Sequence, residues 1–376
     1  MSNDRILAYD LHDVDSIPSP SLLFFQEGIE HNLQSMLRIV GDPNRLCPHC
    51  KTHKTRELIR RQLALGITHH KAATLTEAEM LTDAGVPDVL IAFPLVGPNL
   101  PRLRQLLDAA TQTRFSVLAD SFDGVELLSQ AVQGATRPLN VLVDLDTGMG
   151  RTGIPPGPAA IQLMETVASS PGLQLEGLHW YDGHHRQADP VERRQAVLAG
   201  WEHFVRFRDQ AALSGLPIRR IVAGGSGSFP FLAQAPEPGL QLSPGTTVLY
   251  DADLMERFPE QPFIPAVGIL TRVVSRPAAD RVTLDVGHKS CCADQPDGKR
   301  LWFPRFPEAM EVGHTEEHLV IESPRLDELT LGEPLVAIPR HACPTVAAHP
   351  HATLLQHGQP VDRWTIAARD RTPFAP

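Results

Sequence analysis

Cysteine is scarce in this chain, which has five cysteines among 376 residues. So small and odd a number excludes a disulfide-stabilised scaffold, and free thiols in a reducing compartment are expected. Long apolar runs are absent too, since no stretch approaches the ~18 apolar residues of a membrane span. The opening MSNDRILAYDLHD lacks the basic and apolar regions of a secretory signal. These absences predict a cytoplasmic protein.

Positive charge is also in deficit. The 34 basic and 44 acidic residues give a formal net charge of -10, which argues against nucleic acid or an anionic membrane as a partner. A small soluble metabolite fits this balance better. The chain has only five lysines, namely Lys51, Lys54, Lys71, Lys289 and Lys299. Because arginine supplies most of the positive charge, each lysine is a candidate for a specific role.

Short apolar runs that favour β-structure alternate with segments of helical period between residues 20 and 223. There are eight such runs, at 21–25, 45–50, 67–72, 88–93, 115–119, 140–146, 173–180 and 219–224. Eight β-α repeats predict an α/β fold of the (β/α)8 TIM-barrel type. An open doubly wound sheet is the alternative, but the glycine-rich dinucleotide fingerprint is missing after the first run.

The pattern changes near residue 240. From there on, strand-like segments separated by turns replace the helical period, which predicts a β-rich second domain. We therefore expect a barrel domain at 19–240, and a β domain formed by 1–18 together with 241–376.

The segment RLCPHCKTHKTRE at 45–57 offers three chemistries. Cys47 and Cys50 have the spacing of thiol oxidoreductases, but those enzymes place the pair at the start of a helix, and here it falls within a β-run. Lys51 directly follows that run. A lysine at a strand end in a barrel mouth can be desolvated, which lowers its pKa and frees the amine for a Schiff base with an aldehyde cofactor. The alternative is a salt-bridged surface lysine.

Polar residues also follow the later runs, at the rim where barrel active sites lie. Arg151 stands in the glycine-rich loop after run 140–146, where it could bind a cofactor ring or a carboxylate, or simply stabilise the loop. Tyr181, His184 and His185 follow run 173–180, and three polar rings at one rim favour a site over packing alone.

A glycine-rich turn follows the last β-run. Its glycines allow close backbone approach, and its amides and hydroxyls can bind a phosphate, although a plain structural turn has the same composition. The candidate phosphate-binding residues are Gly224, Gly225, Ser226, Gly227 and Ser228, with Gly245 and Thr246 further along the chain.

In the β domain, the segment IPRHACPTV contains a candidate metal site. His341 and Cys343 are two residues apart, so they lie on one face if the segment is extended. Imidazole and thiolate suit zinc, and two protein ligands leave positions open as a catalytic metal needs. A buried cysteine beside an ordinary histidine is the alternative.

Taken together, these segments resemble one family. PHCKTHK, LVDLDTGMGRTGI, GLHWYDGH, VAGGSGSFP, SPGTTVLYDAD, LDVGHKS, EEHL and RHACPTV occur in this order along nearly the whole chain. They resemble the D-threonine aldolase and D-serine dehydratase family, which are fold-type III pyridoxal-phosphate (PLP) enzymes. Members have an alanine-racemase-like barrel and a β domain that adds a divalent metal.

The resemblance assigns roles to the residues named above. Lys51 would be the Schiff-base lysine, Arg151 would approach the pyridine ring, and Tyr181 would line the pocket. The segment 224–228, with Gly245 and Thr246, would hold the phosphate. His341 and Cys343 would bind the metal, and the sulfur ligand favours zinc over manganese or magnesium.

Three departures from the family pattern are visible. Cys47 stands where the family usually has an arginine, and Cys343 stands where many of the aldolases have an aspartate, as in the dehydratases. The continuation after Tyr181 differs as well. The general base therefore cannot be transferred from the family, and His53, His184 and His185 are candidates.

The resemblance implies a lyase that acts on D-3-hydroxy amino acids. The expected reaction is retro-aldol cleavage to glycine and an aldehyde. The alternative is a dehydratase that converts D-serine or D-3-hydroxyaspartate to a 2-oxo acid and ammonia. An amino-acid racemase is a third interpretation, disfavoured because no second-base tyrosine motif is evident. The family also implies a homodimer.

Overall fold

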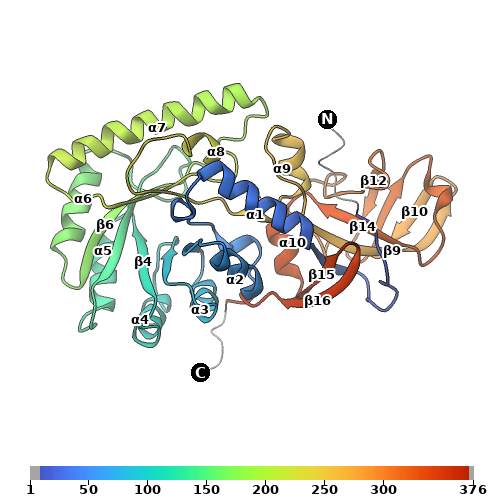
Figure 1. Cartoon of the computed structure of the whole chain (residues 1–376), viewed down its shortest axis with the longest axis horizontal. Coiled ribbons are helices and arrows are strands. Elements are labelled where there is room, and N and C mark those ends of the chain that lie inside the picture. The colour runs from blue at the N-terminus through green and yellow to red at the C-terminus, as the bar shows by residue number, and fades with distance from the viewer. Residues whose placement is uncertain (1–8, 372–376) are drawn as a thin grey trace. The chain divides into compact units, whose positions relative to one another are not determined.

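The computed structural model describes residues 9–371, and the chain divides into two compact units (Figure 1). The barrel unit contains Leu37–Lys51, Arg56–Gly245 and the described residues from Asp370 on. The β-rich unit contains the described residues up to Met36, Thr52–Thr55 and Thr246–Arg369. Among the described residues, no helix is long and apolar enough to cross a membrane.

The barrel unit is built on seven parallel strands that lie side by side in sequence order. They are β2 (His69–Ala72), β3 (Asp88–Ile91), β4 (Arg114–Ala119), β5 (Leu139–Asp144), β6 (Leu173–Trp180), β7 (Arg220–Ala223) and β8 (Leu240–Leu242). The ring is completed by the segment 46–49, in which Leu46 bridges Leu242 and His49 bridges Lys71. Pro48 has no N–H to donate, so this segment forms single bridges and not a regular strand. The predicted barrel is confirmed.

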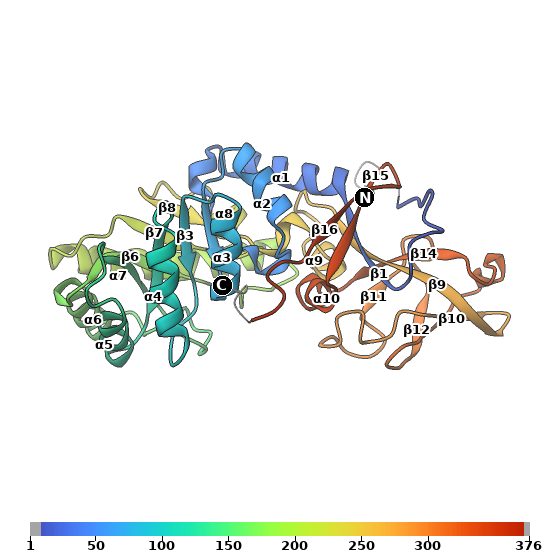
Figure 2. The ribbon, with the colours of Figure 1, turned by 90° about the horizontal axis from the view of Figure 1, so that it is seen from below.

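Helices follow the strands of the barrel unit as the alternating pattern predicted. They are α2 (Arg56–Ala64), α3 (Leu75–Asp83), α4 (Asn99–Ala109), α5 (Phe122–Ala131), α6 (Pro158–Ser169), α7 (Pro190–Leu213) and the short α8 (Phe229–Leu232). Several begin at polar N-caps: Thr74 accepts from the amide of Glu77, and Asp189 accepts from two amides of α7. Helix α3 packs on β2 and β3, and α6 packs on β5 and β6 (Figure 2).

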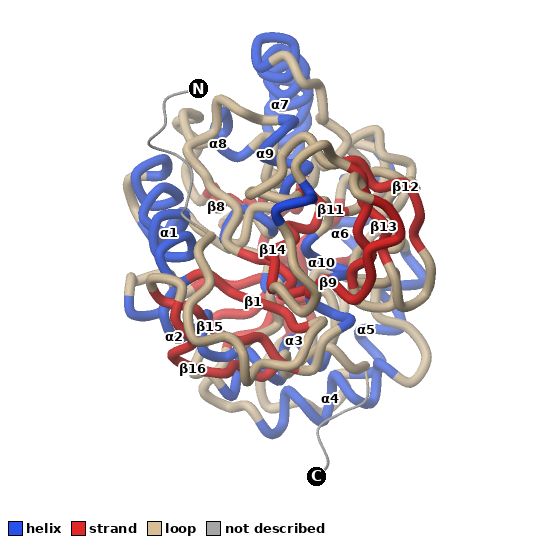
Figure 3. The backbone as a smooth tube through the Cα atoms, turned by 90° about the vertical axis from the view of Figure 1, so that its right-hand side faces the viewer, coloured by secondary structure: helices blue, strands red, loops and turns tan. Residues whose placement is uncertain are grey.

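The β-rich unit confirms the predicted second domain (Figure 3). Its sheet runs in the order β12-β13-β10-β9-β1-β15-β16, and β14 pairs with both β9 and β11. The strands are β1 (Ser21–Phe25), β9 (Val267–Ala278), β10 (Arg281–Leu284), β11 (Leu301–Trp302), β12 (Met310–His314), β13 (Leu319–Glu322), β14 (Pro334–Pro339), β15 (His351–Gln356) and β16 (Gln359–Thr365). The helices are α9 (Ala252–Arg257) and α10 (Ala342–Ala348), and α1 (Gln26–Val40) spans the boundary between the units.

The expectation that 21–25 forms the first barrel strand is wrong. Strand β1 pairs in parallel with β15 and antiparallel with β9, so both of its edges are occupied within the β-rich sheet. A continuous apolar run fits any fully buried strand, and periodicity does not say which sheet receives it. The barrel unit consequently begins at Leu37 and not at residue 19, and it extends to Gly245, because β8 takes a place in the ring.

A buried group of charges lies where the barrel strands begin. The Arg220 guanidinium stands 2.9 Å from an Asp88 carboxylate oxygen and 3.6 Å from Glu176. Arg114 pairs with the same two carboxylates, at 3.0 and 2.6 Å. Burial alone would raise the pKa of Asp88, but the neighbouring His69 and Arg220 outweigh it and lower this pKa to about 2.

Substituting Arg220 tests this group of charges. Arg220→Met leaves two buried carboxylates short of a partner, so the free energy of unfolding should fall by about 3–5 kcal/mol at pH 7, measured by urea titration. Because the pKa of Asp88 is lowered, its contribution is present above the unfolded pKa of about 4 and is lost as the pH falls towards 2. The difference in the free energy of unfolding between Arg220→Met and the wild type should therefore become smaller at acidic pH.

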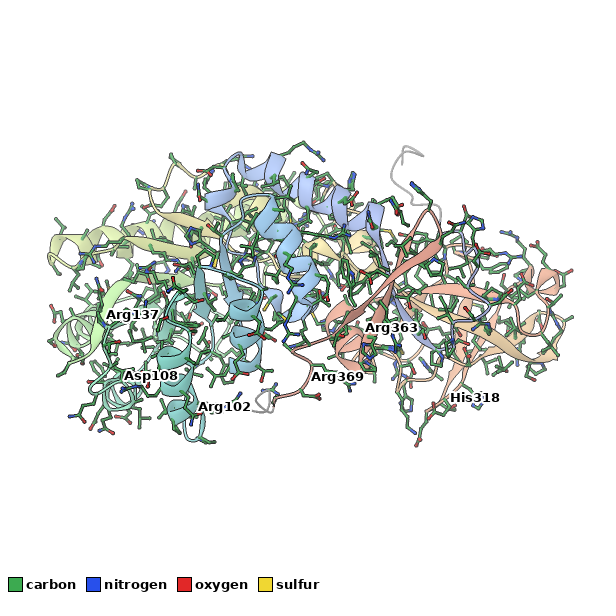
Figure 4. The ribbon with its side chains drawn as sticks, turned by 60° about the horizontal axis from the view of Figure 1, so that its bottom comes forward. Arg102, Asp108, Arg137, His318, Arg363 and Arg369 are labelled. Atoms are coloured by element: carbon green, nitrogen blue, oxygen red, sulfur yellow. The ribbon has the colours of Figure 1, made fainter. Side chains whose placement is uncertain are left out.

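The matched control is Arg137→Met, which changes an exposed arginine of the same unit (Figure 4). It should alter the free energy of unfolding by less than about 0.5 kcal/mol. If both variants unfold like the wild type at pH 7, Arg220 does not stabilise the barrel.

Candidate active site

Most of the predicted site residues in the barrel unit come directly after its strands. Lys51 follows the closing segment 46–49, Arg151 lies in the loop after β5, Tyr181 follows β6 and Gly224 follows β7. Because the strands are parallel, these positions share the carboxyl-terminal rim of the barrel, where active sites of this fold lie. Lys51 is half-buried in the 3₁₀ turn Cys50–Thr52, and its amide donates to Nδ1 of His49 at 3.3 Å.

Arg151 and Tyr181 lie together. The guanidinium carbon is 5.2 Å from the centre of the Tyr181 ring. The loop that carries Arg151 is shaped by Asp146, whose carboxylate accepts from the amides of Gly148 and Gly150 at 2.9 and 3.2 Å. Both glycines have positive φ, 99° and 59°, so side chains there would be strained. A cavity lined by Arg151 and Tyr181 also borders Asp144, Thr152 and His179.

The glycine-rich turn after β7 packs against the same tyrosine. A Cβ on Gly225 would come within 3.1 Å of the Tyr181 ring, so the ring would have to shift slightly to admit a side chain there. Ser228 accepts from the Gly225 amide at 2.9 Å and donates to the Asp182 carboxylate at 2.6 Å. Its hydroxyl proton is therefore committed within the fold and is unavailable to a phosphate oxygen. The amide of Gly227, by contrast, has no acceptor among residues 9–371.

A buried polar network that the sequence did not predict crosses the inside of the barrel. Lys71 of β2 is 2 % exposed, and its Nζ lies 2.6 Å from Oγ of Ser243 and 3.3 Å from Nε2 of His179. Nδ1 of His179 lies 2.6 Å from an oxygen of Asp144, whose other oxygen accepts from Thr152 at 3.0 Å. The rarity of lysine in the sequence was the signal that could have drawn attention to Lys71.

The two cysteines of the C-x-x-C pair are free and point to different partners. The thiol of Cys47 lies 3.6 Å from Arg220, and the thiol of Cys50 donates to Glu77 at 3.7 Å. Ligand atoms of His49, Cys50 and Glu77 lie within 4.8 Å of one another in the interior. This buried group adjoins the turn that carries Lys51. Cys50 belongs to that turn, and His49 accepts a hydrogen bond from the Lys51 amide.

In the β-rich unit, His341 and Cys343 meet, but not as expected. Cys343 is the second residue of α10, so the segment is not extended through it, and His341 occupies the N-cap position. The two side chains lie close enough for Cys343 to act on the pKa of His341. Nδ1 of His341 also lies 2.5 Å from the Asp294 carboxylate. Burial lowers the pKa of His341, but Cys343 and Asp294 outweigh it and raise this pKa to about 9.

These donors fit a zinc ion. A thiol and an imidazole are ligand types that zinc prefers, and a carboxylate on one ring nitrogen orients the other for a metal. The hydroxyl of Thr52 lies 3.2 Å from the Cys343 sulfur, and that of Thr246 lies 3.8 Å from it. The structure thus places Thr246, predicted to bind phosphate, beside a predicted metal ligand.

The candidate bases lie in different settings. His53 belongs to the β-rich unit and is buried, and its Nδ1 accepts from the amide of Thr55 at 3.2 Å. His184 is exposed, with its ring centre 4.1 Å from that of His185. Burial, reinforced by the charge of His184, lowers the pKa of His185 to about 4.

Comparison with known proteins agrees with this architecture. Residues 26–248 match the family described as the alanine racemase N-terminal domain. The chain belongs to this family. Residues 266–355 match a second family, described as a putative serine dehydratase domain. The predicted resemblance to D-threonine aldolases and serine dehydratases is therefore confirmed.

Three similar proteins match nearly the whole chain. A D-threonine aldolase of Arthrobacter sp. is 30% identical over 94% of this chain and 93% of its own length. A D-threo-3-hydroxyaspartate dehydratase of Delftia sp. is 23% identical over 93% of this chain and 97% of its own. The solved structure of D-threonine aldolase from Filomicrobium marinum has a TM-score of 0.88 at 29% identity, covering 95% and 96% of the two chains.

Asp182 gives a test of the interior behind the glycine-rich turn. Burial raises the pKa of its carboxyl to about 6, against the hydrogen bond from Ser228. Because this pKa is above the unfolded value, the contribution of Asp182 to stability should decline as the pH rises from about 4 to 6 and then level off. Asp182→Asn keeps an acceptor for Ser228 and has no charge to bury, so it should gain up to about 3 kcal/mol over the wild type above pH 6.

Urea titrations at pH 4, 6 and 8 measure this difference. Asp120→Asn, a change in a half-buried loop aspartate of the same unit, serves as the control and should show no such growth with pH. A variant of Asp182 that is less stable than the wild type at pH 8 would show that the buried charge is needed.

Proposed function

We propose that this chain is a PLP-dependent lyase that cleaves D-3-hydroxy amino acids, D-threonine among them, into glycine and an aldehyde with the help of a divalent metal. The observation that carries the proposal is the rim of the barrel, where Lys51, the Arg151–Tyr181 pair and the turn at 224–228 follow successive strands. The 30% identity with a D-threonine aldolase over 94% of this chain supports the choice of reaction.

Each residue of the rim has a proposed part in holding the cofactor. Lys51 supplies the amine that bonds covalently to it, and Tyr181 and Arg151 face its ring. The amides of Ser226 and Gly227, together with Gly224, Gly225, Gly245 and Thr246, form the phosphate-binding set. Ser228 shapes the turn through Asp182, and this replaces its predicted role as a phosphate ligand. When bound, the cofactor supplies an electron sink for the bond that breaks.

His341 and Cys343 are proposed to hold the metal, with Asp294 orienting the imidazole. The thiol favours zinc, with manganese and magnesium as alternatives. A metal ion held there would polarise the 3-hydroxyl of a D-amino acid and lower its pKa. The donor set in the β-rich unit, together with the match to a serine dehydratase domain, supports this assignment.

The two outcomes, aldol cleavage and dehydration, differ in which proton is removed. Cleavage of Cα–Cβ needs a base for the 3-hydroxyl, whereas dehydration needs a base for the Cα proton and loss of hydroxide. His53 accepts a hydrogen bond from the Thr55 amide at Nδ1, so it would have to give up this bond to act as that base through Nδ1. His184 is exposed and remains a proposed base. Dehydration stays the second candidate, because the Delftia dehydratase matches over nearly the same length.

The proposed ligand is a small D-amino acid, and a homodimer is proposed from the family resemblance. Neither nucleic acid nor membrane enters the proposal, in line with the net charge of -10.

Product analysis distinguishes the two reactions. Purified protein is incubated with PLP and zinc, and with either D-threonine or D-serine as substrate. Because aldol cleavage is the proposed reaction, D-threonine should be converted to glycine and acetaldehyde. A 2-oxo acid and ammonia would instead identify a dehydratase. Lys51→Ala should abolish either reaction, with a loss of at least about 10³-fold. Lys54→Ala, which changes the lysine two residues after the same turn, is the matched control.

Metal binding tests the second part of the site. Cys343→Ala should weaken zinc binding at least tenfold, because it removes a coordinating sulfur, and Asp294→Asn should weaken it by about 10–100-fold, because the imidazole loses its orienting partner. Competition with a chromophoric chelator measures both. Cys291→Ala removes another buried cysteine of the same unit and should leave the affinity unchanged. Equal affinities for all variants would rule out the His341–Cys343 site.

A further inference from the structure

We propose that Lys71 is a second functional amine of the barrel, held so that its one remaining hydrogen-bonding position faces an acceptor atom on the ring of the bound cofactor. This inference rests on the proposed function, because it assumes a pyridoxal-phosphate ring beside Tyr181. It adds a residue that the sequence analysis did not assign to the site.

Lys71 lies where an ordinary lysine would not. It belongs to β2, yet its side chain reaches His179 on β6 and Ser243 beyond β8, so it crosses the inside of the barrel. A lysine this deeply buried is rare unless its ammonium is paired or bound to a ligand. No carboxylate lies within 4 Å of its Nζ among the described residues, and Asp144 is linked to it by hydrogen bonds through His179.

The hydrogen bonds around Lys71 have fixed directions. Ser243 donates its hydroxyl proton to the carbonyl of Gly224 at 2.9 Å, so it can only accept from Lys71. Nδ1 of His179 faces the Asp144 carboxylate and must carry the hydrogen, which makes Nε2 an acceptor as well. Lys71 therefore donates twice. One position on Nζ is left over: a third N–H in the ammonium form, or a lone pair in the neutral amine.

No side chain or carbonyl among residues 9–371 accepts from that last position. This position is available on the Tyr181 side, because Nζ of Lys71 lies 5.3 Å from the centre of the Tyr181 ring. The guanidinium carbon of Arg151 lies 5.2 Å from the same ring centre. The network also reaches the cavity at this rim, which is bordered by His179 and Asp144 as well as by Tyr181 and Arg151. A pyridoxal ring offers two acceptors, its ring nitrogen and its 3-oxygen, which suit a fixed N–H donor.

The surroundings also determine when this hydrogen is present. Burial lowers the pKa of Lys71 to about 8, and the positive charges of Lys51 and Arg151 act in the same direction. Asp144 and Cys47 act against them. His179 and Asp182 also interact electrostatically with the amine, and burial shifts the pKa of each of them.

Below pH 8 the third N–H of Lys71 is present, and above pH 8 a lone pair takes its place. Cofactor affinity should therefore fall as the pH rises through about 8.

The experiment is a titration of cofactor-free protein with pyridoxal phosphate at pH 6 to 9.5, followed by its visible absorbance. Lys71→Met should bind about tenfold more weakly at pH 7, because one hydrogen bond to a charged donor is lost, and its affinity should no longer change near pH 8. Lys299→Met, an exposed lysine of the β-rich unit, should match the wild type throughout. The dissociation constant is the readout, so the test does not depend on turnover.

A second variant keeps the test informative if Lys71→Met fails to fold. Asp144→Asn retains an acceptor for His179 but removes the charge that raises the pKa of Lys71, so the pH at which affinity falls should move to a lower value. Affinities for Lys71→Met within twofold of the wild type, or an unmoved pH midpoint in Asp144→Asn, would overturn the inference. A wild type that binds no pyridoxal phosphate would instead refute the proposed function.

Discussion

Parallel pairing of β2 to β8 is the constraint on which the site depends. Because every strand of the ring runs in the same direction, each residue that follows a strand reaches the same rim, however far apart such residues are in the sequence. Lys51, Arg151, Tyr181 and Gly224 share that rim for this reason alone. Below the rim, Lys71, His179 and Asp144 extend from three strands of the same ring, so the register that closes the barrel also aligns the buried network.

Strand ends could be read from the sequence because parallel strands are continuous apolar runs and the polar residues after them stand out. The same rule failed at β1, whose apolar run is equally suited to the interior of the β-rich sheet. Contacts between distant residues were not readable either. Asp182 accepts a hydrogen bond from the hydroxyl of Ser228, which is 46 positions away in the sequence. Asp294 is hydrogen-bonded to His341, which is 47 positions away. Neither pair has a periodic or local signal in the sequence.

Two lysines share the barrel unit with different surroundings. Lys51 lies in a turn at the rim, and its amide is fixed by His49, which belongs to the buried group with Cys50 and Glu77. Lys71 lies inside the ring, with two of its donors fixed by Ser243 and His179. A half-buried amine at the rim suits covalent bonding to a cofactor that must be released to a substrate, whereas a buried amine with two fixed hydrogen bonds suits a third fixed one. The rarity of lysine in the chain is consistent with two such specific positions.

We propose that Lys51, and not Lys71, is the amine that bonds to pyridoxal phosphate. Borohydride reduction of the protein loaded with this cofactor makes that bond permanent, and mass spectrometry of the digested protein then locates the pyridoxyl group. We expect the group on the peptide that contains Lys51, with the peptide that contains Lys71 unmodified. A pyridoxyl group on Lys71, or on neither lysine, would contradict it.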